Sequence, residues 1–405
     1  MNKKDRGGPE TEQPLSAGRV EYLEQARRRA RSRRLRRTVA IVVVLAAVIA
    51  FATGRVSSSV SLAKDLVDSA RIALASDPGW PQRTGLMELQ QAEPLSGGFV
   101  ALGEEGCVVY TEGGSRLNAI QSGYARPALA AGKTRFVLYD RAGRELRVES
   151  RTQNLYTKTM DNNIYLCAMS RDGHLAVVTD NVRSVAQLLV YSPSMEQKLC
   201  WDLTAAEGVP LRAAFSPDNK KLAVAAVTAG AGQMVTSLYV LGVNQGDPVC
   251  VSTRSGSMPQ WLGWCSDSRL LLVYDTCAVL CDAAGGEQAV YDFDGRTLAA
   301  VSSGSEGTAL LLSSGQTCEA VLLDADLNVQ SRGSVPSAHR ILRTKDGFYL
   351  LTDDTVECYD LAGTHQWSRV LAARPQALLA GKKRLLVFCG NTVQELTAPE
   401  QAAGS

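Results

Sequence analysis

The segment SPDNKKLAV (residues 216–224) joins a polar turn to an apolar strand, and the same design recurs in SRDGHLAVV (170–178) and CSDSRLLLV (265–273). In each case an apolar strand leads into a turn that contains Asp, and a second apolar strand follows. This pattern is typical of a tight antiparallel hairpin. Its recurrence along the chain indicates a repeated all-β unit.

Further repeats extend this pattern. ARPALAAGKTRFVLY (125–139) nearly superimposes on ARPQALLAGKKRLLVF (373–388), and a strand followed by a turn recurs in FVLYDRAG (136–143), AVLCDAAG (278–285), AVLLDADL (320–327) and VECYDLAG (356–363). A division into four-strand units predicts inner strands that start near Glu93, Ala125, Ile164, Leu211, Gln260, Leu298, His339 and Gln376. The spacing, about 30 to 50 residues, is that of propeller blades.

We therefore predict an all-β fold, a β-propeller over residues 83–399, with eight blades; seven is the alternative, because the first unit is short. The eighth unit ends after its third strand, TVQELT (392–397), while an additional strand, GLMELQQ (85–91), precedes the first unit. If that strand completes the last blade, the ring closes without an exposed edge.

The SPDNKKLAV-type hairpins resemble those of WD-repeat-like and TolB-type propellers, and the less regular units resemble PQQ-type propellers. The whole arrangement resembles an uncharacterised family of membrane-anchored propellers from Gram-positive bacteria, over roughly residues 25–399. These motifs are structural, so the resemblance implies a fold and transfers no functional residue. The single Trp-Asp pair, Trp201-Asp202, falls at the end of an outer strand.

Residues 38–54, TVAIVVVLAAVIAFATG, carry no charge and are predicted to form one transmembrane helix. Residues 1–37 hold twelve Lys/Arg against five Asp/Glu, a net +7, which against the total of +2 leaves −5 for the rest. Because basic residues beside a span stay on the cytoplasmic side, we expect a single-pass protein of the cell membrane with a basic cytoplasmic tail and an extracytoplasmic propeller.

Other interpretations of the N-terminal region remain open. Ala50-Phe51-Ala52 fits a signal-peptide cleavage site, so the segment could be removed after Ala52. The arginine run could also bind nucleic acid, but its position beside the span explains it, and we expect no nucleic-acid partner. Residues 56–77 show apolar positions at three- and four-residue steps, typical of an amphipathic helix, and residues 400–405 form a short tail.

The sequence contains no recognisable catalytic or cofactor motif, so we predict no cofactor and no metal site. Asp140, Asp218, Asp282, Asp324 and Asp360 fall in turns, where Asp usually bonds its own backbone. The glycine-rich stretch at Gly230 lacks the Lys-Ser/Thr ending of a phosphate-binding loop. All ten cysteines follow the span; most lie in apolar runs and are expected to be buried thiols, although pairing cannot be read from sequence.

The candidate binding residues are four arginines at or near the start of inner strands, together with one of two tryptophans three residues apart. Equivalent positions in successive blades gather around one mouth of the ring, so these arginines are predicted to form a basic rim. Trp261 and Trp264 should point to opposite faces of their strand, and packing between blades competes with binding for both. The set is Arg126, Arg212, Arg340, Arg374 and Trp261.

The sequence therefore predicts a non-catalytic binding platform for an envelope protein or an anionic cell-wall polymer. An enzyme is not excluded. The alternatives are an envelope hydrolase or lyase on a propeller scaffold, which needs paired carboxylates in a pocket, and a ligand-sensing ectodomain.

Overall fold

The computed structural model describes residues 68–397 except 73, 231, 245–247, 316 and 382–383. The predicted tail (1–37), span (38–54) and C-terminal tail (400–405) lie outside the described residues, as does most of the predicted helix 56–77. Within that helix, residues 68–72 and 74 are helical, and the helix ends there rather than at Asp77. In the part of the chain that is described, no helix is long and apolar enough to cross a membrane.

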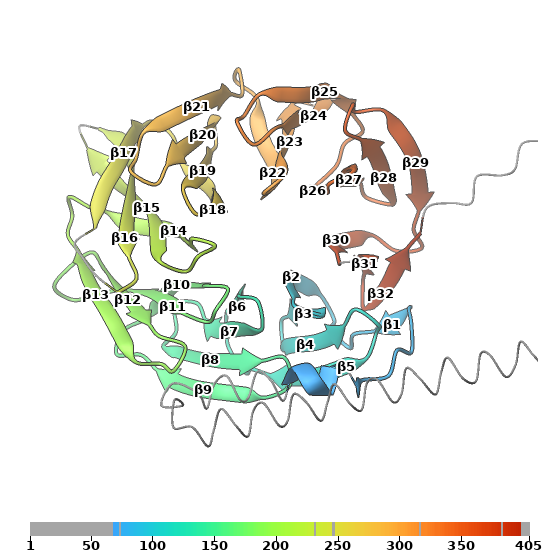
Figure 1. Cartoon of the computed structure of the whole chain (residues 1–405), viewed down its shortest axis with the longest axis horizontal. Helices are drawn as coiled ribbons and strands as arrows, with labels where there is room; N and C mark the ends of the chain where they lie inside the picture. Colours follow the sequence, from blue (N-terminus) through green and yellow to red (C-terminus); the bar gives the residue numbers. More distant parts are fainter. Residues whose placement is uncertain are drawn as a thin grey trace, which may run out of the picture. The chain divides into compact units, whose positions relative to one another are not determined.

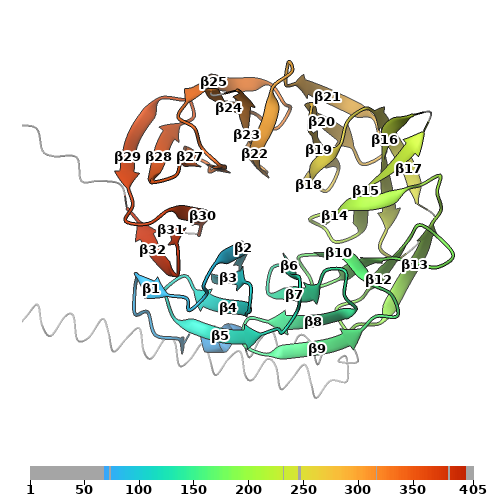
Figure 2. The ribbon, with the colours of Figure 1, turned by 180° about the vertical axis from the view of Figure 1, so that it is seen from behind.

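The described residues form thirty-two strands in eight four-stranded antiparallel sheets, arranged as a ring of blades (Figures 1 and 2). Blades 1 to 3 consist of β2 (Leu89–Leu95), β3 (Gly98–Gly103), β4 (Gly106–Thr111), β5 (Arg116–Gln121); β6 (Pro127–Ala131), β7 (Arg135–Asp140), β8 (Glu145–Ser150), β9 (Asn154–Thr159); and β10 (Ile164–Met169), β11 (Leu175–Thr179), β12 (Ala186–Tyr191), β13 (Gln197–Leu203). Blades 4 and 5 consist of β14 (Val209–Phe215), β15 (Lys221–Gly230), β16 (Gln233–Gly242), β17 (Val249–Ser255); and β18 (Pro259–Ser266), β19 (Arg269–Tyr274), β20 (Cys277–Asp282), β21 (Glu287–Asp292).

Blades 6 and 7 consist of β22 (Thr297–Gly304), β23 (Gly307–Ser314), β24 (Thr317–Leu323), β25 (Val329–Val335); and β26 (Arg340–Arg343), β27 (Gly347–Leu351), β28 (Thr355–Asp360), β29 (His365–Val370). Blade 8 combines both ends of the described chain: β30 (Pro375–Ala380), β31 (Leu385–Cys389), β32 (Thr392–Leu396) and, as its outermost strand, β1 (Gln82–Arg83). The eight-bladed propeller predicted from the repeats is confirmed.

One detail of the predicted closure is wrong. The strand that completes blade 8 is β1, which pairs with β32 through Gln82 and Arg83, and not the segment 85–91. Residues 89–91 instead begin β2, so the inner strand of blade 1 starts at Leu89 and not near Glu93. A two-residue strand shows no alternation of polar and apolar residues, whereas LQQAEPL fits a half-buried inner strand.

The core consists of apolar layers between neighbouring blades. The middle strands of each blade are almost wholly buried, as in β3, β7, β11 and β19. Their residues alternate between two layers: in β11 Val177 packs toward blade 2, while Ala176 and Val178 pack toward blade 4. The ring therefore buries both faces of the middle strands, while outer strands such as β25 and β29 stay largely exposed.

The helix and the residues before β1 form an N-terminal strap, defined as residues 68–72 and 74–81. Asp68, fully buried, is hydrogen-bonded to Thr152 in the β8–β9 turn. Asp77 Oδ2 lies 3.2 Å from Arg384 Nη2 in the β30–β31 connection, and the Gly79 N–H donates to the Gly113 carbonyl between β4 and β5. The strap therefore runs across blades 2, 1 and 8 on one face of the ring, the strap face.

Candidate binding site at the axial channel

The two faces of the ring are built from different connections. Turns between the first and second strands of a blade, and between its third and fourth, lie on the strap face. The far face carries the connections that lead into each inner strand, and the inner strands surround the axis (Figure 2). Residues at the start of an inner strand therefore lie at the far-face mouth of the axial channel.

The four arginines differ in their exposure. Arg126 and Arg374 are exposed and precede β6 and β30, and exposed Arg340 begins β26. Arg212 lies inside β14, half-buried; its Nε donates to the Gln260 carbonyl oxygen at 2.8 Å. Burial, and then the charge of Arg141, lowers the pKa of Arg212. Its contact is with the backbone of the next blade, so the predicted role of the four arginines in binding stays a prediction.

Arg340 and Arg374 belong to adjacent blades, and both affect the pKa of the same histidine, His339. Burial lowers the pKa of His339, and the positive charges of Arg374 and Arg340 add to that effect. A His339 ring nitrogen is 3.0 Å from the Pro375 carbonyl oxygen, which ties the entry of blade 7 to that of blade 8. Arg374 is paired with Asp353 at 2.9 Å, whereas Arg340 makes no ion pair with any residue that the structure describes.

Trp261 and Trp264 point to opposite faces of β18. Trp261 packs in the layer between blades 5 and 6, and its ring lies against Gly263, where a Cβ atom would come within 2.3 Å of the indole. Trp264 packs between blades 4 and 5, and its Nε1 donates to the Ala214 carbonyl at 2.9 Å. Both rings thus pack between blades, which was the alternative to a role in ligand binding.

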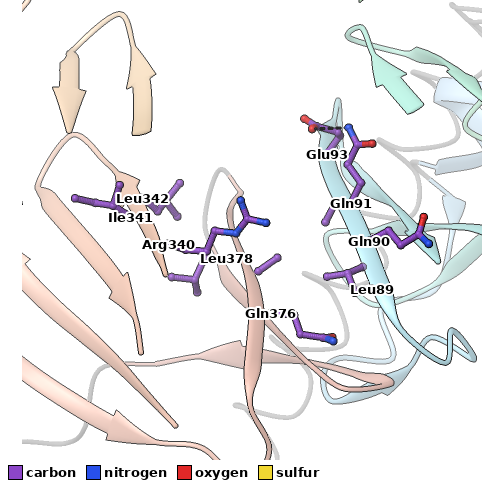
Figure 3. A pocket seen from close by; sticks show the side chains of 11 residues that line it. Leu89, Gln90, Gln91, Glu93, Arg340, Ile341, Leu342, Gln376 and Leu378 are labelled. Atoms are coloured by element: carbon purple, nitrogen blue, oxygen red, sulfur yellow. Dashed lines mark hydrogen bonds between the residues drawn. The ribbon is translucent and has the colours of Figure 1, made fainter. Parts of the chain in front are cut away.

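A cavity of about 210 Å³ lies in the wall of the channel, between the inner strands of blades 7, 8 and 1 (Figure 3). Arg340 reaches from β26 and Gln376 from β30 toward β2, where Gln91 and Glu93 lie together (Figure 3). The remaining lining is mostly apolar: Leu89, Ala92, Ile341, Leu342, Ala377 and Leu378, with Gln90 at the edge of β2.

Two polar groups of this cavity are unusual. The Gln376 side-chain oxygen is buried without a hydrogen-bond partner among the described residues. Burial raises the pKa of the Glu93 carboxyl, against a hydrogen bond from the Gln91 amide that lowers it. Gln91 also exchanges hydrogen bonds with the Leu129 backbone, at 3.0 and 3.3 Å, which fixes blade 1 against blade 2. An unpaired buried acceptor is costly, so a donor from a ligand would be favoured here.

Sequence reasoning found Arg340 but missed the glutamines. Gln90, Gln260 and Gln376 occupy the same place in their blades, the extra residue of a β-bulge near the start of the inner strand. A bulge pushes its extra residue out of the ladder and re-aims it. The Pro-Gln pairs at 259–260 and 375–376 were the available signal, but a bulge cannot be recognised without the partner strand.

A Ser-Asp-His trio in the β10–β11 turn has the composition of a hydrolytic triad but the geometry of a turn. Ser170 and a His174 ring nitrogen both contact Asp172 Oδ1, and the His174 backbone N–H donates to Ser170 Oγ at 2.7 Å. In a catalytic triad the histidine ring must be hydrogen-bonded to the serine hydroxyl. The β14–β15 turn repeats the arrangement without histidine: Ser216 Oγ donates to an Asp218 oxygen at 2.6 Å.

The turn carboxylates serve the backbone. Three of these carboxylates lie where the third strand of a blade leads into the fourth, in blades 5, 6 and 7. Each accepts hydrogen bonds from two backbone N–H groups and one side-chain amide; they are Asp282, Asp324 and Asp360. The bonds from Gly286 and Ala284 lower the pKa of Asp282. Asp140, in the turn between β7 and β8, instead accepts the Arg126 N–H at 2.9 Å.

The described residues hold no group of three or more His, Cys, Asp or Glu side chains placed to bind a metal ion. All ten cysteines are free thiols; six are buried, and Cys200 and Cys250 are exposed. Cys277 and Cys281 share one face of β20, as expected from their spacing, and pack in the layer between blades 4 and 5.

Fold and site together define a β-propeller scaffold. Residues 84–315 match the family of unknown function DUF5711, and the chain belongs to that family. No curated protein matches the sequence significantly.

Several solved structures share the fold. BamB from Moraxella catarrhalis aligns with a TM-score of 0.53 at 14% identity, over 78% of this chain and 96% of its own. Sqt1 from Saccharomyces cerevisiae gives 0.53 at 9% identity, over 79% and 98%. Sqt1 from Chaetomium thermophilum, bound to the N-terminus of the ribosomal protein L10, gives 0.51 at 12% identity, over 75% and 95%. At such identities the likeness concerns the fold alone.

Proposed function

We propose that this chain is a non-catalytic binding platform whose ligand docks at the far-face mouth of the axial channel. The observation that carries the proposal is the cavity between β26, β30 and β2. It is lined by Arg340, which makes no ion pair with a described residue, and by Gln376, whose side-chain oxygen has no hydrogen-bond partner among the described residues. Of the residues that line this cavity only Glu93 carries a carboxyl group. Because glycoside hydrolysis needs a pair, the lining supports binding better than hydrolysis.

The proposal includes a place in the cell. Residues 38–54 would anchor the chain in the cell membrane, with the basic tail in the cytoplasm and the propeller outside, as a platform for an envelope protein or an anionic cell-wall polymer. The chain enters the propeller through the strap, on the face opposite the mouth. A ligand at the mouth would therefore not compete with the strap for the same face.

A related fold offers a precedent for a peptide ligand. The Chaetomium thermophilum Sqt1 structure is of a propeller bound to the N-terminus of another protein. This supports the ability of such a ring to take up a terminal peptide, and it says nothing about the ligand of this chain.

Site-specific photo-cross-linking from the full chain in intact cells tests the proposal. A photoreactive phenylalanine analogue replaces Gln90, the exposed bulged residue of β2 at the edge of the cavity, and in a matched control it replaces Val329, which is 50% exposed on outer strand β25. We expect an adduct from position 90 and none from position 329. Equal labelling at both sites, or no adduct from position 90, would contradict a ligand at the axial mouth.

A further inference from the structure

The axial cavity is small and has one free cation among the residues that the structure describes. Its volume, about 210 Å³, is below the roughly 300–1,000 Å³ of typical small-molecule sites, so it suits a side chain and its backbone better than a large cofactor. Arg340 is exposed there, while neighbouring Arg374 is already paired with Asp353. An unpaired guanidinium favours a carboxylate or phosphate, which it can bind through two parallel hydrogen bonds.

The second polar group of the cavity, the Gln376 side-chain oxygen, needs a hydrogen-bond donor from the ligand. The buried Gln376 oxygen is an acceptor without a partner, so the ligand should bring a donor as well as an anion. A peptide supplies both within a few ångströms, an N–H group from its backbone and a carboxylate from Asp, Glu or its C-terminus. A simple anion without an N–H or O–H group, such as sulfate, would satisfy Arg340 and leave the Gln376 oxygen without a donor.

The apolar walls distinguish a peptide from a polysaccharide. Leu89, Ile341, Leu342 and Leu378 offer aliphatic surface, which suits the apolar side chains that flank an acidic residue. Sugar rings usually stack on aromatic faces, but the lining contains no aromatic side chain, and the nearby Trp261 and Trp264 are held between blades. The chemistry of the cavity therefore favours a peptide.

We propose that the cavity between β26, β30 and β2 binds an extended acidic peptide segment of a partner protein, with a carboxylate on Arg340 and a backbone N–H on Gln376. This inference rests on the proposed binding function and specifies its ligand. Glu93, the carboxyl on the opposite wall, opposes an acidic ligand when ionised and limits its affinity.

Fluorescence anisotropy with the full chain in detergent micelles tests the inference. The probe is a fluorescein-labelled peptide of alternating Glu and Ala, and the matched probe carries Gln in place of Glu. We expect the Glu-Ala peptide to bind, the Gln-Ala peptide to bind about tenfold more weakly, and Arg340→Gln to weaken the Glu-Ala peptide by about tenfold or more. Glu93→Gln should increase the affinity for the Glu-Ala peptide.

The control variant is Arg183→Gln, which removes an exposed far-face arginine in the β11–β12 connection, outside the cavity lining. Its affinity should match that of the wild type. Absence of binding, equal affinity of the two peptides, or equal loss in the Arg183 and Arg340 variants would overturn the inference. If position 90 cross-links to a polysaccharide while the Glu-Ala peptide does not bind, the platform function is retained and the peptide ligand is refuted.

Discussion

Two junctions of the ring are built in opposite ways. Between blades 4 and 5, the inner strands are joined reciprocally near the axis: Arg212 donates to the Gln260 carbonyl and Trp264 to the Ala214 carbonyl. Between blades 8 and 1 the junction is apolar: Ala92, Ala377 and Leu379 of the inner strands pack against a cluster that contains the rings of Trp80, Phe99, Tyr110 and Phe388.

The difference leaves space at the second junction. Besides the axial cavity, a largely apolar hollow of about 290 Å³ opens there toward the strap face, lined among others by Leu95, Phe99, Leu379 and Leu386. The strap and β1 hold this junction from outside, through Trp80 Nε1 to the Glu112 carbonyl and Tyr110 Oη to the Arg83 carbonyl. The junction where the chain closes its ring thus also borders the axial cavity.

The largest expected effect tests whether the aromatic cluster holds the closing junction. Phe99→Ala removes a side chain that is 2% exposed and contacts the rings of Trp80, Tyr110 and Phe388. We expect the free energy of unfolding to fall by about 3–5 kcal/mol, measured by urea denaturation of the full chain in detergent micelles. A loss below about 1 kcal/mol would mean that the strap and β1 close the ring without the cluster.

The next effect probes the axial bond of the opposite junction. Trp264→Phe keeps most of the ring in the layer between blades 4 and 5 but leaves the Ala214 carbonyl without its indole donor. The expected loss is about 1 kcal/mol, measured in the same denaturation series. A neutral substitution would show that apolar packing alone joins these blades, and the contrast between the junctions would weaken.

A third substitution tests how burial of the Glu93 carboxyl in the axial cavity affects stability. Burial raises the pKa of Glu93, so the folded state holds this proton more tightly than the unfolded chain does, and wild-type stability falls as pH rises from the unfolded pKa through the folded one. Glu93→Gln removes that penalty. The variant should be more stable than the wild type above the folded pKa, by less than the Trp264 effect, and should lose its advantage in acid. A pH-independent difference in melting temperature would argue against this cause.

The smallest effect concerns the strap. Asp77→Asn breaks the exposed ion pair with Arg384, which keeps Glu395 as a second partner at 3.2 Å. The cost should be about 0.2–1 kcal/mol and should shrink as salt is added, as thermal denaturation at low and high ionic strength would show. A loss that persists at high salt would point to a packing role for Asp77 beside Gly113.

The strand pattern in the sequence predicted most of the ring. The starts of the inner strands at Ile164, Gln260, Leu298, His339 and Gln376 lie within one residue of the observed ones, because alternation and turn chemistry are local properties. The closing strand was misplaced because pairing across the whole length of the chain leaves no mark on a two-residue segment. Arg340 was found because it begins a strand.

The sequence by itself determined a repeated all-β unit, a ring of eight or seven blades and the charge asymmetry around residues 38–54. These follow from periodicity and composition, which act over a few neighbouring residues. Only the tertiary structure decided that Arg374 pairs with Asp353 while Arg340 has no ion-pair partner among the described residues, where the bulged glutamines lie, and where the axial cavity forms. Those features depend on the packing of blades whose residues lie as far apart in the chain as Leu89 and Gln376, and no local pattern encodes that contact.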